Sequence, residues 1–269
     1  MKLLCWNIQW CRGVDGVVDP ARIAREARRI DPDVACLQEV AAHFPDMPGS
    51  RGEDQPEALS KELQGYDYAF SSGVDLPGPR NRKRFGNLVL SRLPMGRVLR
   101  HSLPWPAAPE VPSMPRVAVE AVIEAPFGPL RIITTHLEYY SSAHRAAQID
   151  RLAEVHREAL AQRLEVKEGS FQSPRRPASA IVCGDFNLPP QDPLHRRMLE
   201  HGFVDAWQAL NPGRPHPPTF RLYEHDEGET PYCCDYLFVT PDLVPRLREI
   251  RIDGATQASD HQPVSVTLA

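Results

Sequence analysis

The sequence predicts one domain of mixed α and β structure, with mostly short strands in more than one sheet. Its 269 residues suit one large domain, and a hydrophobic fraction of 42% with 25% charged residues is typical of a chain that buries one sizeable core. Strand-like and helix-like segments alternate early in the chain, and strands then crowd together. Because no shift in composition marks a linker, we expect residues 1–269 to form a single domain.

Two buried strands and two helices are expected before residue 65. Asp19 is a helix-capping residue type, Pro20 suits the first helical position, and Asp31-Pro32 ends the apolar stripe that follows. The apolar runs on either side of this helix have the length and composition of buried strands. The elements are the strand Leu3–Gln9, the helix from Pro20, the strand Val34–Gln38 and the short helix Pro56–Leu63.

Short strands dominate the rest of the chain, interrupted by one long helix. Phe70, Leu88–Leu90 and Val98 fall in short strands. Arg116–Glu124 alternates like a strand, and Leu130–His136 is its expected hairpin partner. The later elements are the helix Ser142–Leu164, the polar loop Gly169–Pro177, the strand Ser179–Gly184, a helix opened by Asp192-Pro193, and the strands Tyr236–Thr240, Glu249–Asp253 and Val264–Leu268.

Composition and charge exclude several classes of protein. A net charge of −4 is not that of a strongly basic nucleic-acid binder, so an anionic partner needs a local basic patch or a metal. No apolar run is long enough for a membrane span, and the N-terminus does not resemble a signal peptide, which favours the cytoplasm. The six cysteines show no Cys-x-x-Cys spacing and indicate structural thiols. No membrane and no obligate protein partner is expected.

Polar residues stand where the predicted strands end. A sheet brings the ends of its strands together at one rim, where sites are commonly built. The set consists of carboxylates, carboxamides and histidines without cysteine, which favours Mg²⁺ or Mn²⁺ over zinc. A metal, a carboxylate that orients a water and a histidine can together hydrolyse phosphate esters. These residues are Asn7, Glu39, His136, Asp185, Asn187, Asp235, Asp260 and His261.

Six short motifs then make the chain recognisable. They occur in the order Trp6-Asn7-Ile8, Leu37-Gln38-Glu39-Val40, Thr135-His136-Leu137, Gly184-Asp185-Phe186-Asn187, Asp235-Tyr236 and Ser259-Asp260-His261-Gln262-Pro263-Val264. The ordered set resembles the endonuclease/exonuclease/phosphatase superfamily, which has a DNase I-like or exonuclease III-like fold. The resemblance implies an α+β fold: a four-layer α/β/β/α sandwich of two mixed β-sheets flanked by helices.

The resemblance also implies a role for each matched residue. Glu39 is the principal carboxylate for Mg²⁺ or Mn²⁺, with Asn7 beside it, and Asp260 completes the metal site or binds a second ion. Asp185 orients and deprotonates the attacking water, and Asn187 holds that water or a phosphate oxygen. In the remaining roles His261 stabilises charge on the phosphoryl oxygens, Asp235 fixes His261 through its other ring nitrogen, and His136 binds the scissile phosphate.

Substrate-binding residues are expected among less specific features. Arg84 ends the basic run Arg80–Arg84, which is either a solvated loop or an electrostatic guide for a polyanion. Arg116 resembles an arginine that many superfamily members place near the phosphate. Arg145, on the long helix, and Tyr139, directly after the His136 motif, border the substrate or serve packing.

The sequence therefore predicts a Mg²⁺-dependent phosphoesterase that hydrolyses phosphodiesters by in-line attack of an Asp185-activated water. Nucleic acid, DNA or RNA, is the first expected substrate. The alternatives are a small organic phosphodiester or phosphomonoester as substrate, and a non-catalytic binding module on the same fold. The binding module is disfavoured because the residues that catalysis needs, Glu39, Asp185 and His261, are all present.

Overall fold

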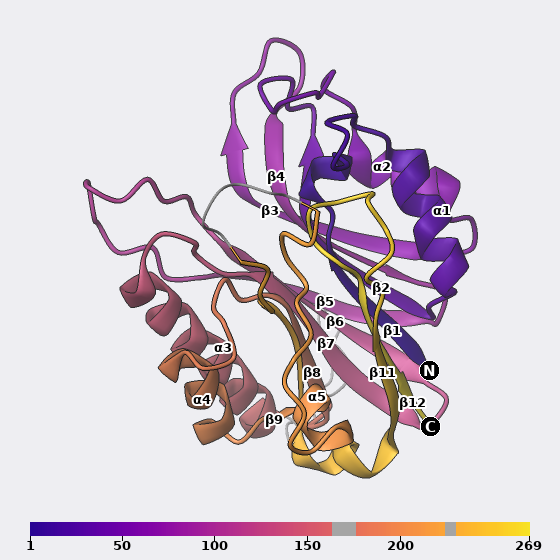
Figure 1. The fold of residues 1–269 in the computed structure, drawn as a ribbon, viewed down its shortest axis with the longest axis vertical. Helices are drawn as coiled ribbons and strands as arrows, with labels where there is room; N and C mark the ends of the chain where they lie inside the picture. Colours follow the sequence, from indigo (N-terminus) through magenta and orange to yellow (C-terminus); the bar gives the residue numbers. More distant parts are fainter. Residues whose placement is uncertain (163–175, 224–229) are drawn as a thin grey trace, which may run out of the picture.

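Two six-stranded β-sheets pack face to face, and helices cover the outer face of each (Figure 1). The computed structural model describes residues 1–162, 176–223 and 230–269. The first sheet has the order β11 (Leu247–Ile252), β12 (Val264–Leu268), β1 (Lys2–Asn7), β2 (Val34–Ala42), β4 (Lys83–Ser91) and β3 (Asp67–Leu76). The second has the order β5 (Met95–Ser102), β6 (Val117–Ala125), β7 (Gly128–His136), β8 (Ala180–Asp185), β10 (Asp235–Val239) and β9 (Val204–Asp205).

Each sheet contains one parallel pair of strands, and the other pairs are antiparallel. β1 pairs in parallel with β2, and β7 pairs in parallel with β8. The helix α1 (Pro20–Ile30) connects the first pair and α3 (Ser142–Gln162) lies in the connection of the second. The first sheet is also covered by α2 (Gln55–Glu62) and the second by α4 (Pro193–Glu200), while the short α5 (Ala206–Leu210) follows β9.

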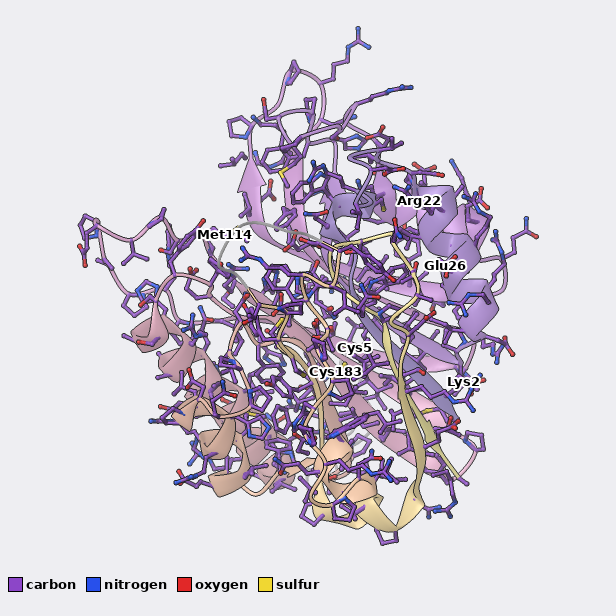
Figure 2. All side chains as sticks on the ribbon, in the orientation of Figure 1. Lys2, Cys5, Arg22, Glu26, Met114 and Cys183 are labelled. Carbon is purple, nitrogen blue, oxygen red and sulfur yellow. The ribbon has the colours of Figure 1, made fainter. Side chains whose placement is uncertain are left out.

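Three apolar layers hold this sandwich together. In β1, Leu3 and Cys5 face the second sheet, while Leu4 and Trp6 pack with residues of α1 such as Ile23. Cys5 and Cys183 lie near the centre of the molecule, in the layer between the sheets (Figure 2). Because both faces of these central strands are covered, their sequences are continuously apolar rather than alternating.

The sandwich predicted from the resemblance is confirmed, with differences in the lengths of elements. The first strand ends at Asn7 rather than Gln9, because Gln9–Cys11 forms a 3₁₀ turn with φ between 42° and 62°. The strands expected to be short near Phe70 and Val98 contain 10 and 8 residues. The last residues of the expected helix Ser142–Leu164 and most of the loop Gly169–Pro177 lie outside the described residues.

All six cysteines are free thiols and are buried, as expected for structural thiols. Within the described ranges, no helix combines the length and the apolar character that a membrane crossing needs.

Candidate active site

Strand pairing brings the predicted site residues to one rim of the sandwich. In the first sheet, Asn7 at the end of β1 pairs with Gln38, the residue before Glu39. In the second sheet, Asp185 at the end of β8 lies between its two paired neighbours, His136 on β7 and Asp235 on β10. Because the sheets face each other, both groups of strand ends point into the same region.

The backbone is strained at two of these residues. Glu39 has φ 58° and lies in a bulge of the β2–β4 pairing, and Asn187 has φ 52°. Such left-handed conformations are unfavourable for residues other than glycine and cluster at functional sites. Gly184, before Asp185, is required for another reason: a Cβ atom there would lie 1.8 Å from the carbonyl oxygen of Thr135. The motif Gly184-Asp185-Phe186-Asn187 therefore encodes the backbone geometry as well as the side chains.

Asn7 connects the polar groups of the two sheets. Its Nδ2 donates to Glu39 Oε1 at 3.0 Å and to Asp185 Oδ2 at 3.0 Å. The other carboxylate oxygen of Asp185 accepts a hydrogen bond from the backbone N–H of Asn187 at 2.8 Å. This network fixes the orientation of both carboxylates before any substrate enters.

His261 is held from both sides and is placed beside Asp185. Its Nδ1 lies 2.9 Å from Asp235 Oδ2, and its Nε2 faces Asp185 Oδ2 at 3.6 Å. The hydroxyl of Thr219 donates to the same Asp235 oxygen at 2.6 Å, and Phe220 stacks on the imidazole with ring centroids 4.4 Å apart. A histidine held in this way has a fixed orientation and presents Nε2 to the site.

His136 and Asn187 form a second pair at the rim. Asn187 Nδ2 lies 2.9 Å from His136 Nε2 and 2.9 Å from the carbonyl oxygen of Leu137. An amide donor on Nε2 fits a neutral imidazole whose proton is on Nδ1. Burial and the positive charges of Arg116 and His261 agree with this, because they lower the pKa of His136 well below its ordinary value.

Burial and neighbouring charges also shift the pKa values of the ionisable groups of the site. Burial and the neighbouring charge of Asp260 raise the pKa of Glu39 to about 7. Burial raises the pKa of Asp185 to about 6. Burial alone would lower the pKa of His261, but the charges of Asp235 and Asp185 raise it well above its ordinary value.

The donor set at this rim fits a hard divalent cation. Glu39, Asp185 and Asp260 all border one pocket, and their carboxylates repel each other in the absence of a positive charge. Asp260 is held in place by Gln9 Nε2 at 2.8 Å and by the Ser259 hydroxyl at 3.1 Å. Carboxylate and amide oxygens are the ligands that Mg²⁺ and Mn²⁺ prefer.

The pocket that these residues border has a volume of about 520 Å³. Arg116 and Tyr139 line it, and their predicted substrate contacts stay predictions. Arg116 is buried, with Nε 3.5 Å from Glu138 Oε2, and its Nη1 has no hydrogen-bond partner among the described residues. The lining residues are Trp10, Glu39, Phe44, Met47, Val74, Phe85, Pro112, Met114, Arg116, His136, Tyr139, Tyr140, Asp185, Asn187, Phe220, Asp260 and His261.

Arg84 and Arg145 do not line this pocket, and their predicted substrate contacts stay predictions. Arg84 lies in β4, with its guanidinium 5.7 Å from the centre of the Phe70 ring. Arg145 Nη1 donates to the backbone carbonyls of Glu138 and Tyr139, so it supports the loop that carries Tyr139.

Three residues of the network were missed by the sequence reasoning. Gln9 positions Asp260, Thr219 positions Asp235, and Phe220 packs on His261. Gln9 directly follows the motif Trp6-Asn7-Ile8 and could have been found there. Thr219 and Phe220 belong to no predicted element and carry no signal of their own.

Comparisons with known proteins agree with this geometry. A model of the endonuclease/exonuclease/phosphatase family matches residues 4–261. An endonuclease/exonuclease/phosphatase from Beutenbergia cavernae is 26% identical with a TM-score of 0.75, and the match covers 100% of this chain and 72% of that one. No curated protein sequence matches the chain at a significant level.

Two more distant structures share the fold. A mannosyl-6-phosphatase of Bacteroides thetaiotaomicron is 17% identical with a TM-score of 0.70, covering 100% of this chain and 99% of that one. A 3′ phosphatase from Neisseria, solved with a product DNA hairpin, is 18% identical with a TM-score of 0.65, again covering 100% and 99%.

Proposed function

The chain belongs to the endonuclease/exonuclease/phosphatase family, and from this we propose that it is a divalent-metal-dependent phosphoester hydrolase. The observation that carries the proposal is the convergence of Asp185, the His261–Asp235 pair and Arg116 on one pocket. It joins a candidate base, an oriented cationic donor and an anion-binding group, which are the parts that phosphoryl transfer to water needs.

Glu39, Asn7 and Asp260 would hold Mg²⁺, with Mn²⁺ as a substitute. When bound, the cation supplies Lewis-acid stabilisation of the negative charge on the phosphoryl oxygens. The mutual repulsion of Glu39 and Asp260, which helps raise the pKa of Glu39 to about 7, is the kind of strain that a cation relieves.

Asp185 would accept a proton from the attacking water. Its carboxylate is oriented by Asn7 and by the backbone of Asn187, so it needs no rearrangement to bind a water on its pocket side. As the oxygen of the water attacks phosphorus in line, its proton passes to Asp185. The bond to the leaving oxygen breaks, and that oxygen keeps the electron pair and takes a proton from solvent to leave as an alcohol. A positioned base of this kind contributes about 10²–10⁴ in rate.

His261, His136 and Arg116 would hold the phosphoryl group, and Asn187 would hold the attacking water through Oδ1, because its amide hydrogens already bond to His136 and Leu137. His261 is the strongest donor because the charges of Asp235 and Asp185 favour its cationic form. Arg116 Nη1 is a buried donor with no hydrogen-bond partner among the described residues, and a phosphate oxygen would satisfy it. Donors fixed before the reaction stabilise the transition state without reorganisation, and losing one typically costs about 10²–10³ in rate.

A panel assay tests the proposed reaction. The intact protein is incubated with phosphomonoesters, phosphodiesters, abasic DNA and RNA, each with Mg²⁺, Mn²⁺ or EDTA. We expect turnover of at least one phosphoester with either cation and none with EDTA. If the folded protein hydrolyses no phosphoester with any cation, the non-catalytic binding module is the better description.

A further inference from the structure

The pocket wall beyond the phosphate-binding residues is apolar. It is built largely from three segments: the loop after β2, the paired strands β3 and β4, and the loop before β6. These segments contribute the apolar residues Phe44, Met47, Val74, Phe85, Pro112 and Met114. Trp10, Tyr139, Tyr140 and Phe220 add aromatic rings to the lining.

This apolar wall is formed in advance of substrate binding. Lys83 on β4 contacts Asp46 at 2.7 Å and lies 5.4 Å from the centre of the Phe44 ring, which ties the loop after β2 to the strands. On β3, a Cβ at Gly73 would lie 2.3 Å from the carbonyl oxygen of Pro115, so the loop before β6 packs directly on this strand. The loop carries Met114 to the pocket (Figure 2).

Part of the basic run predicted to guide a polyanion is paired with acids. Arg82 pairs with Asp75 and Lys83 pairs with Asp46. Of the described residues, none from Arg80 to Arg84 lines the pocket, and Arg116, which does, faces Glu138. Binding of nucleic acid depends on cations that are free to neutralise successive phosphates, so these pairs weaken the case for a long polyanion.

We propose that the preferred substrate is a small phosphoester whose organic group is aromatic or otherwise apolar; this rests on the proposed hydrolytic function. The phosphate would lie against His261, His136 and Arg116, and the organic group against the wall of Val74, Phe85 and Met114. A volume of about 520 Å³ suits a single small molecule. A sugar would bury hydroxyl groups against this wall without hydrogen-bond partners, which is unfavourable.

The experiment compares substrates whose leaving groups have similar basicity. 2-Phenylethyl phosphate and mannose 6-phosphate both release a primary alkoxide, so intrinsic reactivity does not decide between them. We expect kcat/KM to be at least about tenfold higher for 2-phenylethyl phosphate, in line with the discrimination of apolar pockets. A short oligonucleotide should be a poorer substrate per linkage. Preference for the sugar phosphate or the oligonucleotide would overturn this inference and leave the proposed hydrolysis intact; no turnover of any phosphoester would overturn the hydrolysis itself.

Substitutions in the apolar wall test whether it contacts the organic group of the substrate. Val74→Thr is close to isosteric, Met114→Gln keeps the chain length, and both place a polar group against the organic part of the substrate. Val17→Thr is the matched control, because Val17 is 54% exposed and does not line the pocket. We expect each wall variant to reduce the ratio of kcat/KM for 2-phenylethyl phosphate to that for mannose 6-phosphate by about threefold or more, and the control to leave the ratio unchanged. An unchanged ratio in both wall variants, with normal melting temperatures, would overturn the assignment.

Discussion

The substitution Asp185→Asn separates the chemistry of the site from its stability. Asparagine keeps the size of the side chain but removes the base. One side-chain oxygen can still accept the hydrogen bond from the Asn187 backbone, now 2.8 Å long, so the rim should keep its backbone geometry. We expect kcat to fall by about 10² or more, the range of general-base contributions, while KM holds or falls because a charge that repels phosphate is gone.

The expected change in stability of Asp185→Asn follows from the contacts and the burial of Asp185. The new amide nitrogen faces the Nδ2 of Asn7, so one hydrogen bond worth about 1 kcal/mol is lost. Against this, burial raises the pKa of Asp185 from 3.8 to about 6, which corresponds to at most about 3 kcal/mol of unfavourable free energy for the charged form at neutral pH. The melting temperature of the metal-free variant should therefore equal or exceed that of the wild type.

Steady-state kinetics and thermal unfolding in EDTA are the measurements, with Asp67→Asn as control. Asp67 is an exposed aspartate at the start of β3, outside the pocket. Full activity of Asp185→Asn on every phosphoester that the wild type hydrolyses would refute the role of base. A large fall in melting temperature that accounts for the lost activity would make Asp185 a structural residue.

Three further outcomes are expected. Glu39→Gln should weaken Mg²⁺ binding about tenfold or more in calorimetry; wild-type affinity would exclude Glu39 as a ligand. His261→Ala should reduce kcat by about 10²–10³ and Asp235→Asn by less, and the double variant should lose little more than His261→Ala alone; additive losses would mean that the two act independently. Burial alone would raise the pKa of Glu120, but hydrogen bonds from His101 and Arg176 lower it to about 2. The charge of Glu120 therefore contributes fully to the free energy of unfolding above pH 4.5, and this contribution is lost as the pH falls toward 2. In urea unfolding, the difference in free energy of unfolding between the wild type and Glu120→Gln should shrink from pH 6 to pH 3. A difference that stays constant would contradict this.

The sequence was most informative where one physical requirement dominates. Strands buried on both faces must be apolar, so Val34–Gln38 and Ser179–Gly184 were correctly predicted from composition alone. Helix caps were equally clear: Asp19 and Asp192 accept hydrogen bonds from the first turns of α1 and α4. Lengths were less predictable, because β3 and β4 extend well beyond their apolar centres through pairing with each other.

The site residues also fall into those that the sequence could predict and those that it could not. Its candidate reactive residues occur in short motifs, so Glu39, Asp185 and His261 could be found from the sequence. Asp185 ends β8 as predicted, whereas Glu39 lies at a bulge inside β2 and His261 precedes β12. Thr219 and Phe220 could not, because they reach Asp235 and His261 through tertiary packing of a loop that has no periodicity. The ion pairs of Arg82 and Lys83 were also hidden, since the partner acids lie 7 and 37 residues away in the chain.

The two parallel strand pairs explain why the catalytic residues meet. Each pair is joined through a helix on the outer face, and each carries polar residues at the rim: Asn7 at the end of β1 and Glu39 at the bulge of β2 in the first sheet, His136 and Asp185 at strand ends in the second. Neither pair holds the complete set, so the site exists only where the rims of the two sheets face each other.

The relative position of the sheets must therefore be fixed close to the site. Directly before Glu39, the buried Gln38 donates from Nε2 to Thr134 Oγ1 on β7 at 2.8 Å, which ties the first sheet to the second. At the rim itself, Asn7 donates to Asp185 across the same boundary at 3.0 Å. Small buried thiols such as Cys5 and Cys183 fill the layer between these sheets, which lets the backbones approach closely enough for both bonds. The apolar interior and the polar rim are thus parts of one arrangement, in which packing between the sheets sets the distance between the half proposed to bind the metal and the half proposed to activate water.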